Sequence, residues 1–123
     1  MSNWIRFTIN NKKFFGTVEN KKITQYEGDM FGDCNKTDNI YELDKVKILN
    51  PCVPTKLIAL WNNYKSLANE KGLEKPNNPL YLNKAISCII GQGDKIIRPK
   101  TYNENIFFEG ELGIVIGKKC KEV

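Results

Sequence analysis

The chain of 123 residues contains no histidine. A Cys–His nucleophile pair and a Ser–His–Asp triad therefore cannot be built from it alone. Its four cysteines, Cys34, Cys52, Cys88 and Cys120, include no C-x-x-C pair, and no histidine is present to complete a zinc site. We expect these cysteines to be small buried or half-buried thiols in a reducing compartment.

A long hydrophobic run is also missing. No apolar stretch approaches the roughly 20 residues of a membrane span. The first residues, MSNWIRFTINNKK, carry polar side chains throughout, unlike a signal peptide. The hydrophobic content of 41% and charged content of 27% are ordinary for a globular domain. We therefore expect a cytoplasmic protein without a membrane partner.

Arginine is scarce, although the formal net charge is +5. Only 2 of the 19 basic residues are arginine, and no basic run is longer than a pair. A surface that clamps nucleic-acid phosphates favours clustered arginine. The sequence therefore predicts no nucleic-acid partner. A small basic β protein that binds some other acidic partner stays open, and such binding would weaken steeply with salt.

The first 50 residues consist of short segments in which apolar and polar side chains alternate. This period of two predicts a meander of antiparallel strands over residues 3–9, 14–18 and 22–26. Asn10–Asn11 is a turn signal, and Gly16 is expected to break the second strand. The acidic, turn-rich residues 28–39 predict a surface loop.

A domain boundary is expected near residue 50. Residues 43–49 alternate as another strand, which ends at Asn50–Pro51 because proline cannot donate to a ladder. We therefore place an N-terminal β module in residues 1–50 and a second unit in residues 51–123.

The second unit is predicted to open with a buried strand over residues 55–61. A helix follows, capped by Asn62 or Asn63 and stopped by Gly72. Residues 80–84 alternate as a strand that ends at Lys84. Gly91, Gly93 and Asp94 then indicate a turn, and Ile96 and Ile97 are expected to enter another strand.

The segment FFEGELGIVIGK, residues 107–118, sorts into two faces with a period of two. One face holds apolar side chains such as Leu112 and Ile114, and the other holds Glu109 and Glu111. Residues i and i+2 of a strand lie roughly 6.5–7 Å apart and point the same way. Two carboxylates so placed repel each other unless a cation or proton lies between them, and Mg²⁺ prefers such oxygen ligands. A half-exposed strand with solvated glutamates is the structural alternative.

Four stretches in register resemble the fumarylacetoacetate hydrolase family: ILNPCVPTKLIALWNNY, PLYLNKAISCII, GQGDKIIRP and FFEGELGIVIGK. The resemblance implies an α+β, mostly β fold. Its antiparallel meander would be followed by the first part of the family's β-roll with one short helix. It also implies a divalent-metal-dependent hydrolase, isomerase or decarboxylase that acts on 2-oxo or 1,3-dicarbonyl acids through a metal-bound enolate.

The same resemblance assigns roles to individual residues. Glu109 and Glu111 match two of the family's three acidic ligands for Mg²⁺ or Mn²⁺. Lys84 and Glu70 are the catalytic candidates, with Lys84 near the substrate anion. Leu67 stands where many members have a histidine that pairs with the glutamate, so Lys65 or a metal-bound water is the remaining candidate proton carrier.

The third acidic ligand is expected a few tens of residues beyond the E-x-E pair. Only twelve residues follow Glu111, and Glu122 is the only acid among them. We therefore expect the N-terminal portion of such a protein, with an incomplete metal site. The alternative is a truncated, inactive fragment or an assembly subunit that needs a second chain. Homodimerisation is common in the family.

Overall fold

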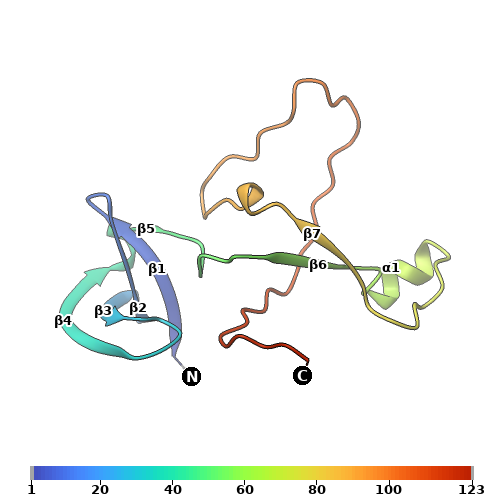
Figure 1. The fold of residues 1–123 in the computed structure, drawn as a ribbon. Coiled ribbons are helices and arrows are strands. Elements are labelled where there is room, and N and C mark those ends of the chain that lie inside the picture. Colours follow the sequence, from blue (N-terminus) through green and yellow to red (C-terminus); the bar gives the residue numbers. More distant parts are fainter. Residues whose placement is uncertain (1, 123) are drawn as a thin grey trace. The chain divides into compact units, whose positions relative to one another are not determined.

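The computed structural model describes residues 2–122, and these form two compact units. The first unit combines the residues through Cys52 with those from Ile90 onward, and the second is Val53–Ile89. The first unit contains a five-stranded sheet, and the second contains a two-stranded ribbon and a short helix (Figure 1). The fold is thus mostly antiparallel β with one short α-helix, as predicted.

The sheet of the first unit has the strand order β4-β3-β2-β1-β5, and every pairing is antiparallel. Its strands are β1 (Asn3–Ile9), β2 (Lys12–Glu19), β3 (Lys22–Gly28), β4 (Cys34–Glu42) and β5 (Lys47–Ile48). The single predicted strand over residues 43–49 is wrong in part. The segment begins with a 3-10 turn, η1 (Leu43–Lys45). Within this segment, the strand that pairs with β1 is β5 alone.

Two-residue turns fix the register of the first three strands. Asn10 and Asn11 have φ of 49° and 61°, and Asn20 and Lys21 have φ of 49° and 63°. Two successive positive φ values are those of a type I′ turn, whose twist matches that of the paired strands. The turn predicted at Asn10–Asn11 is therefore confirmed.

Gly16 lies within β2 and does not break it, contrary to the prediction. It pairs with Gln25 of β3, where the two backbones approach closely. A Cβ at Gly16 would lie 2.0 Å from the Thr24 carbonyl oxygen. The glycine is therefore needed for strand contact and does not end the strand.

The sheet curls around an aromatic core. Phe7 of β1 and Tyr41 of β4 are three strand spacings apart, about 14 Å in a flat sheet. Their ring centroids lie 5.4 Å apart, and Phe14 contacts both rings. Phe7 and Ile23 are fully buried. The inner face of the curled sheet is thus a small hydrophobic core.

The predicted surface loop over residues 28–39 is wrong in part, because β4 begins at Cys34. β4 is a polar edge strand, so it lacks the alternation that indicates a strand. Its register shifts opposite Gln25, whose backbone carbonyl accepts a hydrogen bond from Thr37 Oγ1 at 3.1 Å. The buried Gln25 side chain accepts one from Tyr41 Oη at 2.9 Å. These bonds satisfy a polar group that burial would otherwise penalise.

The second unit holds β6 (Leu57–Trp61), α1 (Lys65–Glu70), β7 (Leu80–Lys84) and the 3-10 turn η2 (Ile86–Cys88). β6 and β7 pair along their whole length, from Leu57 opposite Lys84 to Trp61 opposite Leu80. These two strands confirm the predictions for residues 55–61 and 80–84, with β6 two residues shorter and partly exposed.

The C-terminal end of helix α1 was predicted correctly, whereas its N-terminal end was not. The proposed asparagine cap is wrong, because Tyr64 is the N-cap and no side chain caps the helix. Asn62 has φ of 55° and donates from Nδ2 to the Glu74 carbonyl. At the other end, Gly72 has φ of 64°, Gly72 N–H donates to Asn69 and Leu73 N–H donates to Ala68. This is a Schellman motif, as the glycine predicted.

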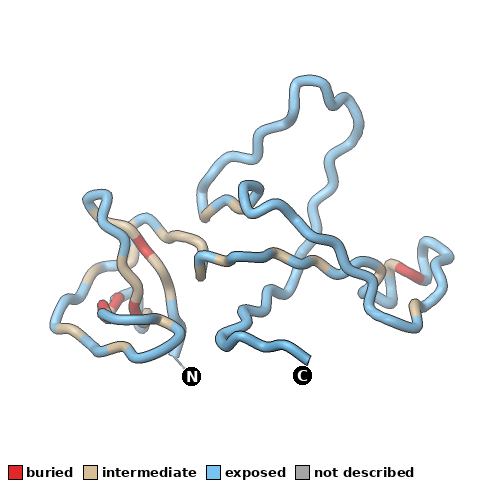
Figure 2. Tube along the Cα trace, viewed as in Figure 1, coloured by how far each residue is buried: buried red, intermediate tan, exposed pale blue. Residues whose placement is uncertain are grey.

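From residue 90 onward the described chain contains turns but no strand or helix. The strands predicted at Ile96–Ile97 and over residues 107–118 are therefore wrong for this structure. A period of two sets which side chains share a face, but a strand also needs a neighbouring strand to bond with. Nearly all of this segment is exposed (Figure 2). Among residues 2–122, no helix has the length and apolar character that crossing a bilayer requires.

Candidate functional site

Glu109 and Glu111 lie in the exposed segment that follows residue 106. Neither belongs to a strand, so the backbone does not impose the shared direction that the sequence predicted. Within residues 2–122, no three His, Cys, Asp or Glu side chains are grouped so that they would hold a metal ion. The described structure therefore offers two carboxylates of the predicted pair and no grouped third ligand.

The donor chemistry of this pair still fits a hard divalent ion. Mg²⁺ is commonly held by one or two carboxylates, with water molecules and substrate oxygens completing its shell. Glu109 and Glu111 are both exposed and accessible to such an ion. Two carboxylates suit a weakly held Mg²⁺ or Mn²⁺ that needs further oxygen donors.

The other two predicted site residues lie in the second unit. Glu70 is the last residue of α1, and Lys84 is the last residue of β7. Both side chains are exposed. Leu57 pairs with Lys84 across the β6–β7 ribbon, so the ribbon fixes the backbone that presents the lysine. The structure thus divides the four predicted residues between two units.

The GQGD stretch forms the turn that the sequence predicted. Asp94 N–H donates to the Gly91 carbonyl at 3.1 Å, and Gly93 has φ of 79°. The Asp94 carboxylate also accepts a hydrogen bond from Gly91 N–H at 2.8 Å. A turn with positive φ at its third residue favours glycine there.

Lys47 is the residue that sequence reasoning missed. Its Nζ lies 2.9 Å from Asp94 Oδ1, although 47 positions separate the two residues in the chain. The sequence placed Lys47 only within the alternating residues 43–49, and nothing in a local pattern indicates so distant a partner. The lysine of β5 thereby ties the GQGD turn to the N-terminal sheet.

The pKa of Asp94 is lowered by its hydrogen bond with Lys47, and further by the Gly91 N–H bond and the lysine's charge. A carboxyl whose folded pKa lies below its unfolded value stabilises the fold above the unfolded pKa. This contribution is lost as pH falls from about 3.9, the ordinary aspartate value, through the lower folded pKa. The turn is therefore held by a charged Asp94 at neutral pH.

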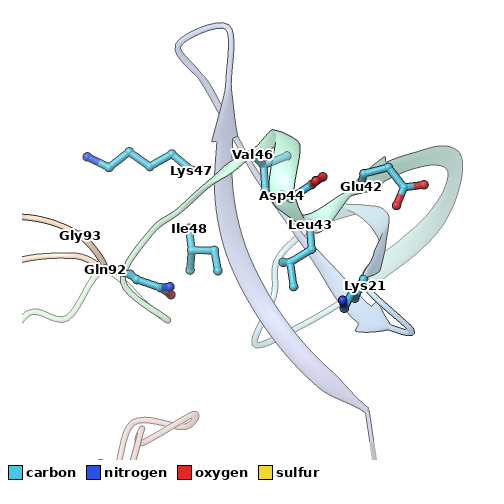
Figure 3. Close-up of a pocket in the computed structure, with 9 residues that line it drawn as sticks. All are labelled: Lys21, Glu42, Leu43, Asp44, Val46, Lys47, Ile48, Gln92 and Gly93. Atoms are coloured by element: carbon cyan, nitrogen blue, oxygen red, sulfur yellow. The ribbon is translucent and has the colours of Figure 1, made fainter.

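An open pocket of about 650 Å³ lies beside this contact, between the sheet and the GQGD turn. Figure 3 shows the Lys47 side chain extended from β5 on the side of Gly93, with Gln92 beside Ile48. The other residues that line the pocket are Lys21, Glu42, Leu43, Asp44 and Val46. Acidic and basic side chains both line it, so its charge selects no single class of ligand.

Two family models match the chain and together cover most of it. The Rv2993c-like N-terminal domain matches residues 3–51. The fumarylacetoacetate hydrolase C-terminal domain matches residues 56–123, which include all four predicted site residues.

Three curated relatives illustrate the similarity. A protein of Archaeoglobus fulgidus is 38% identical over 121 residues, which are 96% of this chain and 43% of that protein. A 2,4-didehydro-3-deoxy-L-rhamnonate hydrolase of Sphingomonas is 37% identical over 55% of this chain and 24% of its own. The mitochondrial oxaloacetate tautomerase Fahd2a of Rattus norvegicus is 37% identical over 57% and 22%. The chain thus spans less than half the length of each of these relatives.

A solved structure shows the same fold. The crystal structure of a 2-hydroxyhepta-2,4-diene-1,7-dioate isomerase from Mycobacterium marinum matches with a TM-score of 0.57 and 18% identity. The match covers 71% of this chain and 33% of that one.

Proposed function

The chain belongs to the fumarylacetoacetate hydrolase family, and on this premise we propose that it is part of a divalent-metal-dependent enzyme acting on 2-oxo or 1,3-dicarbonyl acids. The observation that carries the proposal is the E-x-E pair, which lies within the matched residues 56–123. Two relatives support the substrate class, because one is named for oxaloacetate, a 2-oxo acid, and the other for a didehydro sugar acid.

In the proposed site, Glu109 and Glu111 hold Mg²⁺ or Mn²⁺. The ion would act as a Lewis acid on the oxo group of the substrate. Lys84, a cation at the end of β7, is proposed to bind the carboxylate of the substrate. Glu70 on α1 is proposed as the second catalytic residue, and Lys65 of the same helix or a metal-bound water is proposed as the proton carrier. Leu67, one turn before Glu70 in this helix, exchanges no proton, so the usual histidine base has no counterpart here.

We propose that the two parts of the chain matched by the family models have different roles. We propose that residues 1–50 form an N-terminal β module and that residues 51–123 belong to the catalytic domain, a division that the matches over residues 3–51 and 56–123 support. Hydrolysis of a C–C bond, isomerisation and decarboxylation all suit this site, because each develops negative charge on an oxygen that a metal ion stabilises. The names of the relatives include a hydrolase and a tautomerase.

Isothermal titration of the 123-residue chain with Mn²⁺ and Mg²⁺, alone and with oxalate as a 2-oxo acid mimic, tests the proposal. We expect weak binding of the ion alone, because two carboxylates and water are a small ligand set. Oxalate adds two oxygen donors and is expected to tighten binding about tenfold or more, since each 1.4 kcal/mol is worth a factor of ten.

Glu109→Gln and Glu111→Gln keep the side-chain size and remove the charge. Each is expected to abolish the binding, whereas Glu104→Gln, an exposed glutamate of the same segment, leaves it unchanged. Binding that survives both substitutions would refute the assignment of the ligands. Leu67→His is expected to give no turnover of an acylpyruvate while a third ligand is absent.

A second candidate function is an assembly subunit that works only with a second polypeptide. Exposed apolar side chains favour it: Phe107, Phe108 and Leu112 are 84%, 95% and 84% exposed. An exposed segment with so much apolar surface is typical of an interface. A second polypeptide that pairs with this segment and carries the rest of the fold would also supply the third ligand.

A further inference from the structure

We propose that Lys47 and Asp94 are positioning residues. Their ion pair docks the GQGD turn onto the N-terminal sheet and so sets where the segment that carries Glu109 and Glu111 begins. The docking is independent of the proposed function, whereas its consequence for metal binding rests on that function.

The Asp94 carboxylate makes two contacts, one with the charged Lys47 and one with a backbone N–H. Asp94 uses both carboxylate oxygens, Oδ1 toward Lys47 Nζ at 2.9 Å and Oδ2 toward Gly91 N–H at 2.8 Å. One side chain therefore closes the turn and fastens it to β5 at the same time. The side chains are 58% exposed for Lys47 and 39% for Asp94, so the contact is accessible and local.

The sheet side of the contact is itself anchored. Lys47 pairs with Thr8 of β1, and Leu49 N–H donates to the Arg6 carbonyl at 2.8 Å. Arg6 Nη1 in turn donates to the Asn50 carbonyl at 2.9 Å. A fixed backbone on both sides of Lys47 gives the lysine a defined origin, which positioning requires.

The turn also lies against this backbone. A Cβ at Gly91 would lie 3.5 Å from Asn50 Oδ1 and 3.8 Å from the Ile48 carbonyl oxygen. Gly91 therefore lies close to the end of β5, at the distance that one added side-chain carbon would bridge. The ion pair thus joins the turn to the sheet at a point where the two backbones already lie close together.

Beyond the turn, a second local contact closes a loop and so reduces the distance that the chain can span between Asp94 and the carboxylate pair. Arg98 Nη1 donates to the carbonyls of Tyr102 and Glu104, at 3.2 and 3.0 Å. The closed loop over residues 98–104 acts as a spacer between Asp94 and the carboxylate pair. The docked turn thus limits the volume that Glu109 and Glu111 can explore, because a tethered segment spreads with its free length.

Nuclear magnetic resonance of the full chain tests this proposal with Lys47→Ala, Lys47→Arg and Asp94→Asn. Lys45→Ala is the matched control, because Lys45 is a neighbouring exposed lysine whose ion-pair partner among residues 2–122 is Asp44, at 3.8 Å. Hydrogen exchange at the Gly91 amide reports docking of the turn. The amide shifts of Glu109 and Glu111 report positioning without any metal.

We expect Lys47→Ala to speed Gly91 exchange about two- to fivefold, the range of an exposed ion pair. The amide shifts of Glu109 and Glu111 are expected to move as well. Asp94→Asn should act in the same direction, Lys47→Arg should restore the wild-type values, and Lys45→Ala should change nothing. Unchanged Gly91 exchange in Lys47→Ala would overturn the docking, and unchanged Glu109 and Glu111 shifts would overturn the positioning.

A Mn²⁺ titration of the same samples separates this proposal from the proposed function. If the wild-type chain binds Mn²⁺, Lys47→Ala is expected to weaken binding and Lys47→Arg to restore it. Absence of Mn²⁺ binding in the wild type would count against the proposed function alone, because the exchange and shift measurements still decide the docking and the positioning.

Discussion

Gly16 shows how one missing side chain fixes the contact between two strands. Its place in β2 brings the Thr24 carbonyl oxygen to within 2.0 Å of where a Cβ would lie, and this neighbour is backbone. We expect Gly16→Ala to destabilise the first unit by about 3 kcal/mol, the upper range for overpacking, because the backbone of β3 must move. Urea unfolding followed by the fluorescence of Trp4, in a Trp61→Phe background, measures the change.

Gly113→Ala is the matched control for this prediction. A Cβ at Gly113 would have nothing within 4 Å, so we expect a change within about 0.5 kcal/mol. Equal effects of the two substitutions would mean that the close approach at Gly16 is not what requires a glycine.

At the residue scale, the sequence indicated which residues form the GQGD turn but not what their side chains touch. Gly91, Gly93 and Asp94 were predicted as a turn because these residue types favour one. The partner of Asp94 is Lys47, which lies in β5, 47 positions earlier in the chain. A pairing of this kind depends on how β5 joins the sheet, and no local pattern contains that information.

At the scale of a single element, substitutions at Asn11 test the turn of the β1–β2 hairpin. Asn11 has φ of 61°, a left-handed conformation that a β-branched residue adopts at a cost of about 1–2 kcal/mol. We therefore expect Asn11→Val to destabilise the first unit by that amount, and Asn11→Gly to be neutral or slightly stabilising. The same urea unfolding measures both.

Asn35→Val provides the control for the hairpin. Asn35 is an exposed residue of the edge strand β4, opposite Glu27, and its φ is not positive. Its replacement by a good strand former is expected to leave stability within about 0.5 kcal/mol. Loss of stability at Asn35 comparable to that at Asn11 would show that the turn conformation is not the cause.

Elements with a local signal were predicted well, and those that depend on pairing were not. The first three strands, the β6–β7 ribbon and the glycine stop of α1 follow from alternation and turn chemistry. β4 was missed because an edge strand can be polar on both faces. Residues 107–118 were predicted as a strand from the same alternation, yet in the described chain they have no strand to pair with, so the pattern alone did not suffice.

At the scale of the whole molecule, the exposed apolar side chains of residues 107–116 predict association. We expect the chain to self-associate with rising concentration, as sedimentation velocity would show. Leu112→Lys and Ile114→Lys place charges in the exposed apolar stretch and are expected to shift the chain toward the monomer. Val53→Lys is the control, because Val53 is 75% exposed and lies in the other unit. A monomer at every concentration would contradict the interface.

The curled sheet has a consequence for how the chain is made. Its five strands all come from the first 48 residues, and β1 to β4 each pair with a neighbour in sequence. Contacts of such short separation form quickly, and an N-terminal unit folds first during synthesis. The sheet is therefore expected to be closed before Asp94 is translated, so the nascent GQGD turn meets a finished surface with Lys47 already in place.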